Sequence, residues 1–204
     1  FFGFFSLCVS ATAGIALAGN LFTLFVFYEI LTLVTYPLVI HRGTPAALAA
    51  GRTYLLYTLP AGALLLLAVA ASQVLTGPQD FVGGGYLKPF AGEHATTLVL
   101  LFAALVTGFG VKAALVPLHG WLPLAMVAPA PVSALLHAVA VVKAGAFAIV
   151  RVVYEMFGVE FAATLGVLTP LAVLAAVTIV YGSLRALMQD ELKKRLAYST
   201  VSQV

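Results

Sequence analysis

The chain has 204 residues, of which 63% are hydrophobic and 8% are charged. Soluble domains carry about 25% charged residues, so the composition predicts a membrane protein and excludes an ordinary soluble enzyme domain. Because one transmembrane helix takes roughly 20 apolar residues, the length allows about six or seven spans. The single cysteine, Cys8, excludes a disulfide framework and any cysteine-ligated zinc or iron–sulfur site.

Long apolar segments that alternate with short polar or glycine-rich connections predict an all-α, polytopic transmembrane bundle. A tight turn is expected at residues 19–20, a connector at 41–52, and one long loop at 77–94 that marks a membrane surface. A further helix, the start of a seventh span, is expected to begin near Asp190. In chain order, the six predicted spans cover residues 1–19, 21–40, 54–75, 96–112, 132–154 and 161–187.

The fourth predicted span is crowded by prolines at its far end, although the sequence there stays apolar. Pro117, Pro123, Pro129 and Pro131 follow one another within 15 residues, and a proline inside a helix breaks or kinks it. The pattern predicts one broken helix at membrane depth. Irregular backbone at that depth is tolerated where it is buried in protein or lines a watery cavity, and broken helices often mark ion paths in transporters.

Three charged residues lie well inside predicted spans: Glu29, Lys112 and Lys143. A charge at the bilayer centre costs about 2.5 to 3.5 kcal/mol or more, so each must be compensated. One interpretation is a proton relay, in which a carboxylate that moves toward or away from a lysine loads or unloads a proton. The other is structural: ion pairs that fix helix packing, or lysines that extend to the membrane interface.

Histidines and a charged run extend the list of candidates. His137 precedes Lys143 by six residues, which is about 9 Å along a helix, so one or two waters could bridge the two side chains. His119 lies beside Pro117 and also titrates near physiological pH. A histidine in an apolar helix is as readily a hydrogen-bonded packing residue. The run at residues 190–195 is typical of a solvated helix start with acids at its N-terminus.

Basic residues are distributed unevenly between the two predicted membrane faces. If every span crosses once, the larger group lies on one face, which predicts that residues 41–52 and 185–195 are cytoplasmic. Basic residues at span ends also account for the net charge of +3, so a nucleic-acid partner is not expected. The larger group is Arg42, Arg52, Arg185, Lys193, Lys194 and Arg195, and the smaller is Lys88 and Arg151.

Four stretches together resemble the proton-conducting, antiporter-like membrane subunits shared by respiratory complex I and the multisubunit Mrp-type cation/proton antiporters. They are residues 19–29, which end on Glu29; 112–123, which begin with Lys112; 128–151; and 190–203. The second stretch is most similar to the D-type antiporter subunit of the Mrp systems. The four stretches cover most of the chain.

The resemblance implies a subunit built from two inverted repeats, each with a broken helix. Residues 1–204 would be its transmembrane ion-translocating domain, an internal fragment that holds the first repeat. Glu29 would modulate Lys112, and protons would pass through waters and His137 or Lys143 toward Lys193. His119 is a further candidate for this relay.

The function that the resemblance implies is proton translocation by one subunit of a multisubunit cation/proton antiporter. Its partners would be other membrane subunits, the lipid bilayer, protons, and sodium or potassium ions, in a bacterial or archaeal cell membrane. The alternative is a proton-pumping subunit of complex I (NADH-quinone oxidoreductase) or of a related hydrogenase. In either complex the subunit would have no redox site, cofactor or metal of its own.

Two hypotheses from other functional classes remain. One is a redox subunit that binds quinone near Pro117, although the sequence offers no cofactor ligands in support of it. The other is a scaffold, in which the intramembrane charges only hold helices together. The sequence contains neither a phosphate-binding loop of the G-x-x-x-x-G-K-[ST] type nor a dinucleotide fingerprint.

Overall fold

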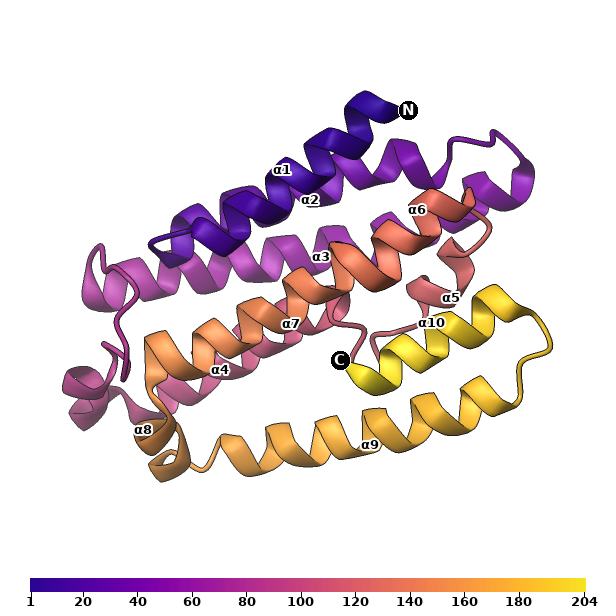
Figure 1. Ribbon diagram of the computed structural model, residues 1–204. Coiled ribbons are helices and arrows are strands. Elements are labelled where there is room, and N and C mark those ends of the chain that lie inside the picture. The colour runs from indigo at the N-terminus through magenta and orange to yellow at the C-terminus, as the bar shows by residue number, and fades with distance from the viewer.

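A computed structural model describes residues 1–204, with every side chain except that of Glu93. Helices dominate the described chain, and its strand-like pairing is one isolated bridge between Asn20 and Asp80. Long helices run side by side along one direction (Figure 1). The prediction of an all-α transmembrane helical bundle is therefore confirmed.

The helices follow one another with short connections. Five stretches are long and apolar enough to cross a membrane, namely residues 21–39, 45–76, 94–112, 130–157 and 168–187, and α1 is a shorter apolar helix of 16 residues. The elements are α1 (Phe2–Leu17), α2 (Leu21–Val39), α3 (Pro45–Thr76), η1 (Lys88–Phe90), α4 (Ala91–Lys112), α5 (Trp121–Ala125), α6 (Ala130–Ala134), η2 (Leu135–Val139), α7 (Val141–Arg151), η3 (Val152–Phe157), α8 (Val159–Thr164), α9 (Leu168–Leu187) and α10 (Leu192–Gln203).

The predicted connector at residues 41–52 is wrong in length, because α3 already begins at Pro45. The Thr44 hydroxyl accepts a hydrogen bond from the Ala47 amide at 3.2 Å, and a proline in the first turn is preorganised for a helix. With 32 residues, α3 is about 48 Å long at 1.5 Å per residue. It exceeds a hydrocarbon core of about 30 Å, so its first turns, with Arg52, reach the membrane surface.

Two other predicted boundaries shift for local reasons. The predicted loop at residues 77–94 is shorter, because η1 contains Pro89 and α4 starts at Ala91, with a kink at His94. The predicted span at 161–187 is two helices, α8 and α9. Gly166 separates them with φ of +73°, a conformation that glycine adopts without steric cost.

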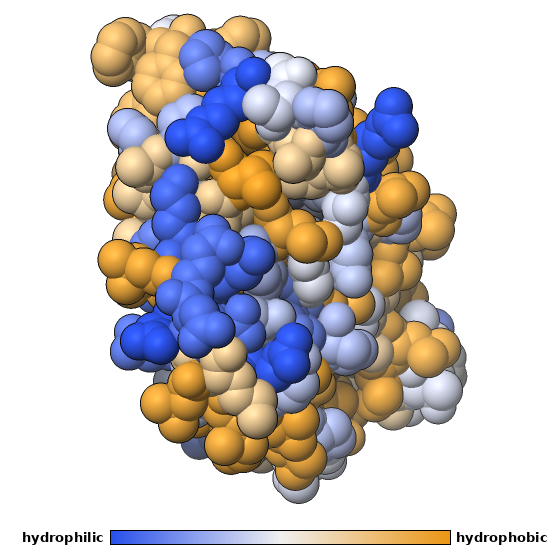
Figure 2. All heavy atoms as spheres, turned by 90° about the vertical axis from the view of Figure 1, so that its right-hand side faces the viewer, coloured by the Kyte–Doolittle hydropathy of each residue, from blue (hydrophilic) through white to orange (hydrophobic). Residues whose placement is uncertain are grey.

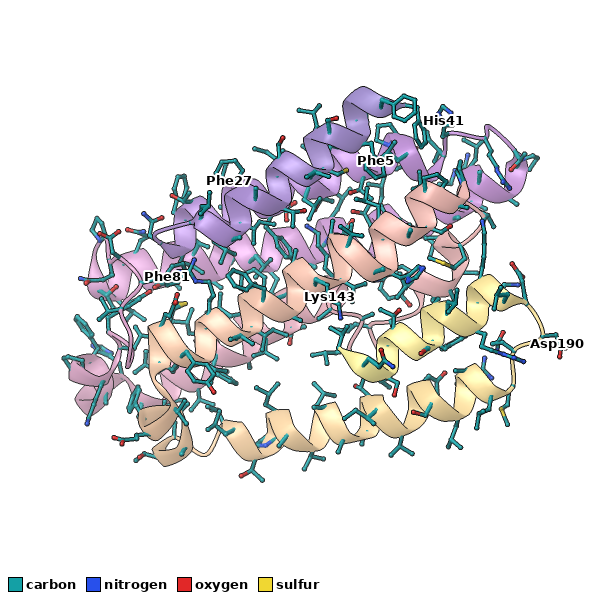
Figure 3. The ribbon with its side chains drawn as sticks, in the orientation of Figure 1. Phe5, Phe27, His41, Phe81, Lys143 and Asp190 are labelled. Atoms are coloured by element: carbon teal, nitrogen blue, oxygen red, sulfur yellow. The ribbon has the colours of Figure 1, made fainter. Side chains whose placement is uncertain are left out.

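Backbone hydrogen bonds tie together the end of the bundle that lies opposite residues 40–44. The Phe81 amide donates to the Gly19 carbonyl at 2.8 Å, and the Tyr86 amide donates to the Met156 carbonyl at 2.9 Å. Arg151 donates to the Ala18 carbonyl, and its guanidinium lies 4.2 Å from the centroid of the Phe81 ring (Figure 3). The α1–α2 turn, the 77–87 loop and η3 therefore form one surface.

The opposite end carries the connections at residues 40–44 and 188–191. His41 and Asp190 both lie toward it in Figure 3. Viewed from this end, hydrophilic side chains gather over part of the face beside hydrophobic surface (Figure 2). The two segments predicted to share a membrane face therefore lie at the same end of the bundle.

Burial is uneven among the helices. The core includes Tyr28, Tyr54, Phe109 and Trp121, each fully buried, whereas only 11% of the α9 span is buried within the described chain. Exposed apolar residues along a helix are typical of contact with lipid or with another membrane helix. The buried part of the bundle is therefore formed by α1 to α7, and α9 with α10 lies along one side of it (Figure 1).

Candidate functional site

The predicted broken helix is present, and the break lies directly after Lys112. α4 ends at this residue, and the chain continues without regular helix to α5 at Trp121. Inside the break, the Leu115 amide donates to the Gly110 carbonyl at 2.9 Å, and the Val116 amide donates to the Thr178 hydroxyl of α9 at 3.1 Å. The protein thus satisfies backbone groups that lipid could not.

Lys112 is the most deeply buried charged side chain at the break, with 1% of its surface exposed. Its Nζ donates a hydrogen bond to the Tyr28 carbonyl and lies 3.4 Å from the centroid of the Tyr28 ring. The Tyr28 hydroxyl in turn donates to the Phe109 carbonyl of α4 at 3.3 Å. A carbonyl oxygen and an aromatic face therefore stabilise the ammonium group.

Glu29 is the next residue on α2, and its carboxylate is only partly satisfied. Its Oε1 is buried without a hydrogen-bond partner. The carboxylate packs over Gly62 of α3, where an added Cβ would lie 2.8 Å from Oε2. The ion pairs among the described side chains join Arg151 to Glu155 and Lys194 to Glu191. Glu29 and Lys112 thus belong to one buried region but do not form a direct ion pair.

His137 and Lys143 meet at a second location. His137 lies in the π-helical turn η2, where the Ala140 amide donates to the Leu135 carbonyl at 2.9 Å. Both side chains line a cavity of about 310 Å³ that α10 closes with Ser199, Thr200 and Gln203. Figure 3 shows Lys143 on the side of α7 that faces the C-terminal part of α10. The structure therefore brings the two predicted residues to one cavity.

Lys193 and His119 lie elsewhere. The Lys193 ammonium donates to the Ala128 carbonyl at 2.8 Å and to the Met126 carbonyl at 3.4 Å, just before α6. The ring of His119 is buried against Tyr181, at 4.9 Å between centroids, and its Nδ1 lacks a hydrogen-bond partner. Neither residue lines the cavity of His137 and Lys143.

Several residues of the site carry no signal of their own in the sequence. Tyr28, Thr178 and Thr200 are an aromatic and two hydroxyl residues in helices, which pattern alone assigns to packing. Gly145 stands out in the sequence only as part of a longer stretch, yet an added Cβ there would lie 2.3 Å from the Ala113 amide nitrogen. Gly145 therefore lets α7 pack directly against the break.

The chemical types of the side chains bear on what the site can bind. Among the described side chains, His, Cys, Asp and Glu residues do not gather in groups of three or more that could hold a metal ion. The residues at the break and in the cavity are instead amines, a carboxylate, imidazoles and hydroxyls. These groups suit the binding and transfer of protons.

Comparison with known proteins gives consistent matches over the chain. Subunit N of the NADH-quinone oxidoreductase of Desulforudis audaxviator is 38% identical over 207 residues, which is 100% of this chain and 40% of that protein. A chain of the membrane-bound sulfane sulfur reductase, an archaeal respiratory membrane complex, superposes with a TM-score of 0.84 at 30% identity, over 98% of this chain and 40% of that one. A chain of the Mrp complex from a Dietzia species gives 0.83 at 31%, over 100% and 22%.

The chain spans about two fifths of the curated relative's length. Residues 18–204 match the family described as NADH:quinone oxidoreductase/Mrp antiporter, TM. The match covers α2 to α10 and so includes the break and the cavity. The chain is therefore an integral membrane protein that belongs to the NADH:quinone oxidoreductase/Mrp antiporter family of membrane subunits.

Proposed function

We propose that this chain is the ion-translocating domain of a larger subunit that moves protons across a bacterial or archaeal cell membrane. The larger subunit would hold two inverted repeats, of which this chain supplies the first, and would work in a multisubunit cation/proton antiporter. The observation that carries the proposal is the Lys112 ammonium, buried at a helix break beside a carboxylate with an unpartnered oxygen. A merely structural pair would be expected to be in direct contact.

The first step of the proposed relay is a movement of Glu29 relative to Lys112. Moving one charge against 100 mV costs about 2.3 kcal/mol. Two opposite charges about 4 Å apart at an effective dielectric of about 20 attract by about 4 kcal/mol. Forming and breaking a Glu29–Lys112 contact is therefore large enough to load Lys112 with a proton and to release it.

From Lys112 the proposed path continues through waters to the cavity of His137 and Lys143. Lys193 would serve at the membrane face where the 185–195 segment lies, with its ammonium held by the carbonyls before α6. His119, buried between the break and α9, is a further candidate. We propose that this face, with the 41–52 segment, is cytoplasmic, because it carries most of the basic residues.

Partner subunits and ions follow from the same family. The likeness to a chain of the Mrp complex supports other membrane subunits as partners and sodium or potassium as the exchanged ion. The 38% identity to subunit N favours the second candidate, a proton-pumping subunit of a complex I-type or hydrogenase-type assembly. In that assembly electron transfer in other subunits would drive the relay.

The deciding experiment measures proton flux with a pH-sensitive dye in everted vesicles that contain the full-length subunit in its native complex. Sodium or potassium is added to wild type, Lys112→Ala and Glu29→Ala. We expect both variants to lose the cation-triggered pH change while the complex still assembles. Lys194→Ala is the control, because Lys194 forms an exposed pair with Glu191 that contributes little.

The other outcomes separate the alternatives. Flux that requires an electron donor and ignores added cations assigns the subunit to a respiratory or hydrogenase complex. Full transport in both variants would reduce the chain to a scaffold. Labelling of α4 or α7 by a photoreactive quinone analogue would instead support the redox hypothesis.

A further inference from the structure

The hydroxyl of Thr200 has one hydrogen and two neighbours. It donates to the Leu196 carbonyl, four residues earlier on α10, at 3.0 Å. It also lies 3.4 Å from Nδ1 of His137. A hydroxyl supplies one donor and two acceptor lone pairs, and threonine in a helix characteristically uses its hydrogen on the carbonyl four residues before.

It follows that the contact between Thr200 and His137 has a defined direction. Because the hydrogen of Thr200 is engaged by Leu196, Nδ1 of His137 must carry the hydrogen and donate it to the threonine oxygen. In a neutral imidazole only one nitrogen carries a hydrogen. Nε2 of His137 is then left with its lone pair free.

We propose that Thr200 is a positioning residue that holds neutral His137 in its Nδ1–H form, so that Nε2 is the nitrogen that accepts protons. His137 and Lys143 line the same cavity, and Lys143 is the charged residue among its lining side chains. A proton that leaves the Lys143 ammonium, directly or through water, binds the Nε2 lone pair and gives an imidazolium. The same nitrogen then releases it, and the bond to Thr200 persists throughout.

The structural part of this inference is independent of transport. The tautomer is a property of the folded protein, whereas its consequence for flux rests on the proposed function. If the Lys112 and Glu29 variants transport normally, the proposed function fails, yet the tautomer of His137 can still be measured. The two failures are therefore distinguishable.

The test is nitrogen NMR of the full-length subunit in its complex, with ¹⁵N-labelled histidine and the His137→Gln variant to assign the signals. A ring nitrogen with a hydrogen and one with a free lone pair give separate resonances. We expect Nδ1 of neutral His137 to carry the hydrogen in wild type and in Thr200→Ser. In Thr200→Val, which keeps the shape and loses the hydroxyl, the Nε2–H form should appear.

Proton flux is the second readout. Thr200→Val should lower it by roughly two- to tenfold, the effect of one hydrogen bond, and Thr200→Ser should restore it. Thr53→Val is the matched control, because Thr53 also donates to a carbonyl four residues earlier but is exposed. A wild-type His137 with its hydrogen on Nε2, or a tautomer unchanged in Thr200→Val, would overturn the inference.

Discussion

At the scale of single residues, the site depends on how two buried charges are accommodated without touching. The ammonium of Lys112 is satisfied by the Tyr28 carbonyl and ring. The carboxylate of Glu29 has room only because residue 62 is a glycine. Burial of an unpaired charge is costly, so such an arrangement is expected where a charge must change partners.

Gly62→Ala tests whether the position of the Glu29 carboxylate matters. The new methyl group would lie 2.8 Å from Oε2, so the flexible Glu29 side chain must move. A shift of about 1 Å changes its attraction to Lys112 by about 1 kcal/mol, which predicts a roughly fivefold change in proton flux. Gly3→Ala, with open space around it, should leave flux unchanged.

At the scale of elements, three segments fix the break. α2 supplies Tyr28, α9 supplies the Thr178 hydroxyl, and α7 packs against the break through Gly145. Ala114, inside the break, is fully buried with φ of +58°, an uncommon conformation for a residue with a side chain. Neighbouring helices, more than local preference, therefore determine the backbone after Lys112.

Gly145→Ala is expected to destabilise the bundle. Its Cβ would lie 2.3 Å from the Ala113 amide nitrogen, and backbone cannot yield as a flexible side chain does. Overpacking of this kind costs about 1–3 kcal/mol, measurable as a lower unfolding temperature of the purified complex. Gly92→Ala in α4, where an added Cβ meets nothing within 4 Å, should not lower that temperature. Equal temperatures for both variants would contradict the close packing of α7.

At the scale of the whole molecule, the connections sort into two ends. Residues 18–20, 77–87 and 154–158 are hydrogen-bonded into one surface. His41 and Asp190 lie toward the other (Figure 3). Since successive spans alternate in direction (Figure 1), the two ends correspond to the two faces of the membrane.

Cysteine labelling can test this arrangement. A membrane-impermeant maleimide applied to everted vesicles, in which the cytoplasmic face is outside, should label His41→Cys and Asp190→Cys but not Gly83→Cys. In right-side-out vesicles the pattern should reverse. The native Cys8 has 0% of its surface exposed and provides an unlabelled background. Labelling of Gly83→Cys together with His41→Cys would disprove the assignment of ends.

The sequence by itself determined the class, the order of the spans, the broken helix and the buried charges. These features follow from local composition, since apolar runs, prolines and intramembrane charges are each read within a few residues. The start of α3 was also encoded locally, in Thr44 and Pro45, but the adjacent charged and glycine residues suggested a longer connector.

Only the tertiary structure decided what the candidate residues contact. Lys112 meets Tyr28 across 84 positions of the chain, and Thr200 meets His137 across 63. It also separated Lys193 from the cavity of Lys143 and left Glu29 out of direct contact with Lys112. Such contacts depend on how whole helices pack and rotate against one another, and no local pattern of residues specifies that geometry.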